Sequence, residues 1–223
     1  LLEERHKRGD DSVRNVTNVS DNVDANITVF SLEAEPSHRL IEFCENNKVP
    51  MVCLLMMGLR TYLQKFNYQD DVSIMSTVAR RATISEKKSG GTRVHCFPCR
   101  TIVNKEETFM EGIEKIREAQ NNLFRHANYN PVEYLNYRTS FYNNEPGQTY
   151  EPLSLTYQPL TMKDVKQRTG QTIDFSGIDY KTNWYSNGAC AHTLYLTVMH
   201  RSNDNGLNFS FEYKTGRVTP EKL

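Results

Sequence analysis

Apolar residues in the first two thirds of the chain recur at the spacing that places them on one face of a helix. One such stripe follows Pro50 and is wide enough to be buried. Another follows Thr108, which forms a capping box with Glu111, since each residue can satisfy an exposed backbone donor near the other. Four helices are predicted, and they open near Glu35, at Pro50, after Thr108 and at Asn130. The apolar stripe of the second helix consists of Val52, Leu55, Met56, Leu59, Leu63 and Phe66.

Alternation of apolar and polar residues predicts β-strands, which become more frequent toward the end of the chain. Residues 94–103 form one of them, and Pro98 requires an edge position or a bulge there because proline has no N–H to donate. Residues 203–206, Asn-Asp-Asn-Gly, tolerate positive φ and predict a hairpin between the last two strands. The polar residues 85–91 predict a loop. The other predicted strands cover 27–32, 72–81, 153–160, 172–178, 194–198 and 207–213.

This succession of elements predicts an α/β fold in which a mixed β-sheet packs against helices. Residues 1–26 are polar and lack a sustained period, so we expect a linker or irregular arm there, followed by one lobe over residues 27–223. Near the last residue, Thr219 and Pro220 match the N-cap and the first position of a helix. A helix that begins so close to the end leads us to expect that the chain is a fragment.

The composition and charge of the chain argue against several classes of protein. Lys plus Arg and Asp plus Glu both number 27, so charge gives no basis for binding nucleic acid or an anionic membrane. No apolar run approaches the roughly 20 residues that span a bilayer. Five cysteines in a chain of this length do not make a disulfide framework. We therefore expect reduced thiols in a cytoplasmic protein that binds neither nucleic acid nor a membrane.

Cys96 and Cys99 form a Cys-x-x-Cys motif, which raises a redox pair and a metal site as alternatives. A redox pair needs its first cysteine at a helix N-terminus, where the thiol pKa is lowered. Here the pair lies in a predicted strand, where residues three apart point to opposite faces. A zinc site needs a second Cys/His pair at ligand spacing. A structural role without metal is therefore favoured.

Several segments carry motifs in a fixed order. After the helix of residues 50–66 comes a strand over 71–81 that ends in two arginines. Residues 91–100 read Gly-Thr-Arg-Val-His-Cys-Phe-Pro-Cys-Arg, and residues 126–133 read His-Ala-Asn-Tyr-Asn-Pro-Val-Glu. With the hairpin of 188–213, they resemble the C-terminal half of the condensation domains of nonribosomal peptide synthetases, members of the chloramphenicol acetyltransferase-like superfamily.

The sequence departs from the motifs of that family at several places. Arg80 stands in the glycine place of a Gly-Arg pair. In the motif Gly-x-Phe-Val-Asn-x-x-x-x-Arg, Arg93 replaces the phenylalanine and His95 replaces the asparagine. One extra residue precedes Pro131 in the motif His-Gln-Asp-x-Pro-Phe-Glu. The histidine at His95 and the extra residue before Pro131 bear on the substrate class rather than on the family.

The resemblance implies one lobe of a two-lobed enzyme, whose other lobe carries the catalytic motif His-His-x-x-x-Asp-Gly. No two histidines of this chain are adjacent, so no catalytic residue is assigned here and the chain alone is expected to be inactive. The parent would form amide bonds in secondary metabolism, between acyl groups held as thioesters on the phosphopantetheine arms of peptidyl or acyl carrier proteins. We expect no directly bound cofactor, the absent N-terminal lobe as a partner, and self-association through the face exposed by its absence.

The resemblance places His95, Arg81 and Arg93 beside the tunnel between the lobes. His95 would touch substrate or act as an accessory base, or it simply fills the asparagine site. Arg81 would pair with the aspartate of the absent motif through its planar fork, or it is an ordinary surface arginine. Structural roles are implied for the other motif residues, which are Gly91, Arg100, His126, Pro131 and Glu133.

Two other functions stay open at this point. The chain would also fit a non-catalytic carrier-docking or interaction module, or part of a coenzyme A-dependent acyltransferase. The sequence immediately upstream of Leu1 would separate the first of these from the enzyme. The run from Glu86 to Lys88 is either a solvated loop or a contact for an acidic carrier protein.

Overall fold

The structure is a computed structural model of the chain of 223 residues. It describes residues 17–18, 24–81, 83–142, 148–149, 153–160, 165–166, 172–173, 183–201, 206–215 and 218, and all structural statements concern these residues.

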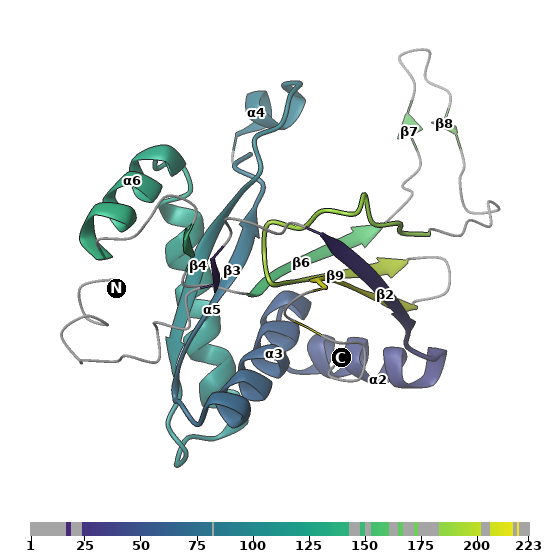
Figure 1. The fold of residues 1–223 in the computed structure, drawn as a ribbon. Coiled ribbons are helices and arrows are strands. Elements are labelled where there is room, and N and C mark those ends of the chain that lie inside the picture. The colour runs from purple at the N-terminus through teal and green to yellow at the C-terminus, as the bar shows by residue number, and fades with distance from the viewer. Residues whose placement is uncertain are drawn as a thin grey trace.

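A mixed six-stranded β-sheet forms the centre of the fold (Figure 1). Its strands lie in the order β2–β10–β9–β6–β3–β4. The central pairs β9–β6 and β6–β3 are parallel, and the pairs nearer the two edges are antiparallel. The predicted mixed sheet is therefore confirmed. The strands are β2 (Ala25–Ser31), β3 (Asp71–Val78), β4 (His95–Ile102), β6 (Leu153–Leu160), β9 (Leu194–Arg201) and β10 (Leu207–Lys214).

Short antiparallel pairs lie outside this sheet. β1 (Thr17–Asn18) pairs with β5 (Gln148–Thr149), and β7 (Val165–Lys166) pairs with β8 (Thr172–Ile173). Only the first two residues of the predicted strand 172–178 fall on a described strand, and the rest lie outside the described residues, as do Thr219 and Pro220.

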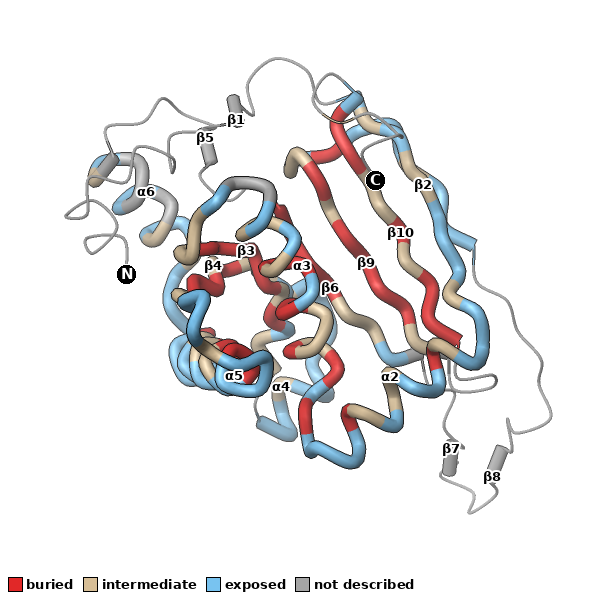
Figure 2. The backbone as a smooth tube through the Cα atoms, turned by 90° about the horizontal axis from the view of Figure 1, so that it is seen from below, coloured by how far each residue is buried: buried red, intermediate tan, exposed pale blue. Residues whose placement is uncertain are grey.

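One face of the sheet is covered by helices. α3 packs on β3 and β6, α5 packs on β4, and α2 packs against α3. Figure 2 shows this side, with α3 and α5 in front of the β3–β4–β6 part of the sheet. The capping box predicted at Thr108 is confirmed, because Thr108 N–H donates to Glu111 Oε2 at 2.7 Å and Glu111 N–H donates to Thr108 Oγ1 at 3.3 Å. The helices are α2 (Ala34–Asn46), α3 (Met51–Asn67), α4 (Ile84–Lys88), α5 (Phe109–Arg125) and α6 (Pro131–Tyr142).

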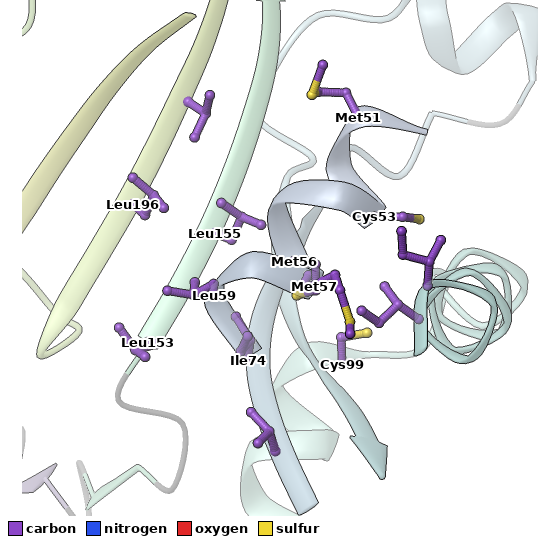
Figure 3. Close-up of a cluster of buried hydrophobic side chains, with 14 of the residues drawn as sticks. Met51, Cys53, Met56, Met57, Leu59, Ile74, Cys99, Leu153, Leu155 and Leu196 are labelled. Carbon is purple, nitrogen blue, oxygen red and sulfur yellow. The ribbon is translucent and has the colours of Figure 1, made fainter. Parts of the chain in front are cut away.

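The main hydrophobic core lies between α3, α5 and the sheet (Figure 3). From α3 it takes Cys53, Met56 and Met57, which are all buried. Gly112 lets α5 approach closely, because a Cβ atom there would lie 2.7 Å from Met57 Cε and the methionine side chain would have to move. Flexible methionine side chains fill the remaining space between the two helices.

The predicted apolar stripe of α3 was partly wrong. Met56 and Leu59 are buried, but Val52, Leu55 and Leu63 are only half-buried. The buried face is turned toward Cys53 and Met57, because α3 contacts both the sheet and α5 and is therefore covered on two sides.

A buried arginine lies on the same helix. Arg60 is 1% exposed. Its Nη1 donates to Gln64 Oε1 at 3.1 Å, and its Nη2 donates to the carbonyl oxygen of Asp70 at 2.5 Å. Burial lowers the pKa of Arg60, against the opposing effect of Asp70 and Asp71. The guanidinium thus fastens the second half of α3 to the turn that leads into β3.

The other face of the sheet is polar and is crossed by the segment before β9. Trp184 Nε1–H donates to the sulfur of Met199, and Ser186 Oγ–H donates to Glu212 Oε1 at 2.7 Å. Met199 and Glu212 lie on the face opposite the helices, because their strand neighbours Val198 and Tyr213 are in the core.

Two predictions about the β3–β4 region have different outcomes. The edge position required by Pro98 is confirmed for the described strands, since β4 ends the sheet order and its register with β3 runs unbroken from His95 to Ile102. The loop predicted over residues 85–91 is partly wrong, because residues 84–88 form the short helix α4. Its capping box, made by Thr83 and Glu86, was overlooked in the sequence.

Candidate functional site

Four motif residues lie in the connection between β3 and β4, which we call the β3–β4 arm (residues 79–94): Arg80, Arg81, Gly91 and Arg93. In Figure 1 it extends from one end of the sheet, with α4 at its tip. Arg80, in the glycine place of the motif, has a φ of 52°. This left-handed conformation is the one that glycine adopts without steric cost, which explains physically why a glycine suits the position.

The side chain of Arg81 donates hydrogen bonds to backbone carbonyl oxygens of its own arm. Its Nη1 donates to the carbonyl oxygens of Glu86 and Ser89, both at 2.6 Å, and its Nη2 donates to the carbonyl oxygen of Gly91 at 2.5 Å. Ser89 Oγ accepts a further bond at 3.2 Å. The planar guanidinium is thus occupied by acceptors of its own arm, an arrangement that the sequence did not indicate.

Gly91 and Arg93 complete the arm. Gly91 has a φ of 88°, so the motif's glycine is accounted for here by a left-handed backbone. Arg93 Nη1 lies 3.5 Å from Glu86 Oε1. Glu86 also accepts the backbone N–H of Thr83 at 3.0 Å. The arm therefore brings Arg81, Gly91 and Arg93 together.

His95 is the first residue of β4 and is half-buried. Its ring lies 6.5 Å from that of Phe97, and Phe97 contacts Tyr134 of α6 edge-on at 6.4 Å. Arg80 Nη2 donates to the carbonyl oxygen of Asn128 at 3.5 Å. Phe97 also shares a buried cluster with Ala127, so the two motif segments 91–100 and 126–133 meet at the arm end of the sheet.

The second motif segment forms the turn between α5 and α6. His126 is exposed and is the C-cap residue of α5. Pro131 is the first residue of α6, where its missing N–H costs nothing. Glu133 Oε1 accepts from Asn130 Nδ2 at 3.4 Å, and Asn130 Oδ1 accepts the N–H of Val132 at 3.0 Å. This segment therefore orients α6.

Arg100 lies at the other end of β4, away from His95. Its Nε and Nη2 donate to the two carboxylate oxygens of Asp71 at 2.7 and 2.5 Å. The side chains are 3% and 11% exposed. A bidentate pair shielded from water is strongly coupled to the fold, so Arg100 ties β4 to β3.

Sequence reasoning missed a chain of side-chain hydrogen bonds on the polar face of the sheet. Thr156 Oγ1 lies 2.6 Å from Thr77 Oγ1 and 2.7 Å from the hydroxyl of Tyr195. Cys96 Sγ lies 3.6 Å from Thr77 Oγ1. The chain links four neighbouring strands. No sequence pattern could have found it, because it depends on which strands are adjacent in the sheet.

The cysteines are free thiols, as predicted. Burial raises the pKa of Cys53 to about 11 and that of Cys99 to about 12. Cys99 is buried and Cys96 is half-buried on the opposite face, so the Cys-x-x-Cys pair is divided by the strand as expected. No group of three or more potential metal ligands lies together among the described residues.

An apolar groove lies on the helical side, where α2, α3 and the start of α5 meet. It is separate from the arm, and its lining consists of Leu32, Pro36, Arg39, Leu40, Phe43, Leu54 and Phe109. Within the described part of the chain, every helix is too short or too polar to cross a bilayer.

Comparison with known proteins assigns the family. The family model of the condensation domain matches residues 11–222. Surfactin synthase subunit 1 of Bacillus subtilis (strain 168) is 23% identical over 194 residues, which cover 87% of this chain and 5% of that protein. The condensation enzyme VibH superposes with a TM-score of 0.69 at 12% identity, covering 99% of this chain and 50% of that one.

The X-domain in a complex with OxyB from teicoplanin biosynthesis has a TM-score of 0.64 at 17% identity, over 99% of this chain and 52% of that one. The chain thus spans about half of the solved structures that it matches and a small part of the curated relative. The order of the motifs, their meeting at one end of a mixed sheet and the family match agree, and the chain belongs to the condensation domain family.

Proposed function

We propose that this chain is the C-terminal lobe of a nonribosomal peptide synthetase condensation domain. The observation that carries this proposal is the β3–β4 arm, where Arg80 takes a left-handed φ in the glycine place and Gly91 takes one in the glycine of the next motif. A span of about half the length of solved condensation enzymes supports a single lobe.

In the proposed reaction, an amine on one carrier-bound phosphopantetheine arm attacks the thioester carbonyl carbon of another. The C–N bond forms, the C–S bond breaks, and the sulfur leaves as a thiol that has taken up the proton lost by nitrogen. The histidine motif of the other lobe would orient the amine and stabilise the tetrahedral intermediate. Phosphopantetheine arms are thus substrates of the reaction.

This lobe would supply one wall of the tunnel in which the two arms meet. We place His95 on the tunnel side of that wall, with Arg81 and Arg93 beside it, because the two arginines lie in the arm and His95 directly follows it as the first residue of β4. Since Arg81 already binds four acceptors of the arm, its contribution to the wall is to shape it.

The test is condensation of two loaded carrier proteins by this chain with and without the N-terminal lobe. We expect amide product only when both lobes are present. Product formed by this chain alone would contradict the proposal. His95→Asn, which restores the residue of the family motif, tests the role of His95. A substrate-side role predicts a changed preference for the amine donor, whereas a residue that only fills space leaves the preference unaltered.

A second candidate is a non-catalytic recruitment module. Two observations favour it. No two of the six histidines of this chain are adjacent in the sequence, and the chain is similar to the X-domain that was solved in complex with OxyB. Binding of a partner enzyme together with failure of the two-lobe assay would favour this candidate over the condensation enzyme.

A further inference from the structure

We propose that the β3–β4 arm is a docking surface for a phosphopantetheinylated carrier domain. This inference rests on the proposed function, and it names the surface and the side chains that meet the partner. The contact residues are Ile84, Lys87 and Lys88 of α4, which we call the α4 face.

The α4 face combines an apolar side chain with two cations. Ile84 is 73% exposed, and Lys87 and Lys88 are exposed as well. Residues spaced by three and four positions lie on the same side of a helix, so the three side chains share one surface. An apolar contact flanked by charges is the composition of a protein-binding spot, in which the apolar group gives affinity and the charges give orientation.

The arm also concentrates positive charge. From Arg80 to Arg93 the sequence has five basic side chains and a single acidic one, although the chain as a whole is neutral. The acidic residue, Glu86, is engaged by Arg93 and by the capping box. Arg81 is turned inward toward the carbonyl oxygens of the arm. The cations left facing outward on the α4 face are therefore Lys87 and Lys88.

The arm holds this face in a defined shape. Arg81 joins the end of α4 to Gly91, and the capping box of Thr83 and Glu86 fixes the start of the helix. Such a framework lowers the entropy lost on binding, because the docking side chains are presented in one arrangement before the partner arrives.

Charge complementarity identifies the partner. A phosphopantetheine arm is joined to its carrier through a phosphodiester, so a loaded carrier has an anion at the point where its arm enters the enzyme. Two lysines near the motif end of the sheet match that anion. The arm's position beside His95 would place the carrier close to the proposed tunnel.

The experiment is an NMR titration of ¹⁵N-labelled holo-carrier domains, encoded beside this chain, with the unlabelled chain. We expect the double variant Lys87→Glu/Lys88→Glu to weaken binding roughly tenfold or more, since two favourable charge contacts become repulsive. Ile84→Ser should weaken it by roughly threefold to tenfold. Raising the salt concentration should weaken wild-type binding as well.

The matched control is Lys65→Glu/Lys105→Glu, which makes the same charge change at exposed lysines of α3 and of the loop before α5. For Ile84 the control is Met110→Ser, a 42% exposed apolar residue of α5. Equal affinities of the α4-face variants and their controls would overturn this inference while leaving the proposed function intact. Failure of the wild-type chain to bind any of these carriers would overturn the proposed function itself.

Discussion

At the residue scale, the most informative position is Arg80, a bulky side chain on a backbone suited to glycine. A left-handed φ costs a residue with a Cβ roughly 1–2 kcal/mol. The family motif and the backbone conformation, which are independent observations, both indicate that glycine suits this position.

We therefore expect Arg80→Gly to raise the free energy of unfolding by up to about 1 kcal/mol, since the strain relieved exceeds the loss of a long hydrogen bond to Asn128. Urea denaturation measures this change. The control is Ala79→Gly at the preceding residue, which has no left-handed φ and should lose roughly 0.5–1 kcal/mol. Equal destabilisation by both glycines would contradict the argument.

The thiols should differ sharply in reactivity. The thiolate is the reactive species, and burial raises the pKa values of Cys44, Cys53, Cys99 and Cys190. Cys96 is the half-buried one. A titration of the native protein with a chromogenic disulfide at pH 8 should show one fast thiol, and all five after unfolding. In Cys96→Ser the fast phase should vanish. Its persistence would show that a core cysteine is accessible.

The ion pair of Arg100 should matter far more than one on the surface. Asp71→Asn leaves the buried guanidinium without its anion and should cost about 3 kcal/mol. The exposed pair of Arg39 and Glu35, with side chains 71% and 74% exposed, provides the control, and Glu35→Gln should cost less than about 0.5 kcal/mol. Chemical denaturation compares the two. Similar losses would mean that the Arg100 pair is open to solvent.

At the element scale, the sequence predicted those features of helices and strands that depend on residues close together in the chain. The capping box and the start of α5 depend on residues within one turn, so they are readable from Thr108 and Glu111. The face of α3 was misjudged because it depends on two packing partners that are distant in sequence. The capping box of α4 could also have been recognised from Thr83 and Glu86, but the polar residues around it favoured a loop.

The α5 capping box also predicts that the stability of the folded protein depends on pH. Hydrogen bonds from the N–H and hydroxyl of Thr108 lower the pKa of Glu111. A lowered folded-state pKa means that the associated stability is present above the ordinary glutamate range and is lost as pH falls through the lowered value. Thermal unfolding should show wild type more stable than Glu111→Gln at pH 7, with the two melting temperatures converging below about pH 4. A constant difference down to pH 2 would contradict this.

At the scale of the whole molecule, the sheet order and the candidate site were only partly accessible from sequence. Alternation predicted the six main strands but not their neighbours, since pairing across the sheet is set by tertiary packing. Resemblance to the family predicted His95, Arg81 and Arg93 beside the tunnel and Gly91 in a structural role. The arm contains Arg81, Gly91 and Arg93, and His95 follows it as the first residue of β4. The chain of hydrogen bonds through Thr156 could not be predicted from sequence either, because it depends on which strands are neighbours in the sheet.

The polar face of the sheet, where Val29 of β2 lies, is crossed by the segment that carries the exposed side chains of Trp184 and Tyr185. We propose that two copies of the chain associate through this face. Light scattering over a concentration series should show a growing dimer fraction, reduced in Tyr185→Ser. Tyr68→Ser, at an exposed tyrosine after α3, is the control. Monomer at all concentrations would refute the proposal.

The pairing of β2 with β10 has a consequence for how the protein is made. Ala25 lies opposite Lys214 in that pair, about 190 residues further along the chain. At a translation rate of roughly 5–20 residues per second, β2 emerges from the ribosome about 10–40 seconds before its partner strand. During that interval its backbone donors are open to any other strand. Slow codons or a chaperone acting after β2 should therefore influence the yield of native protein.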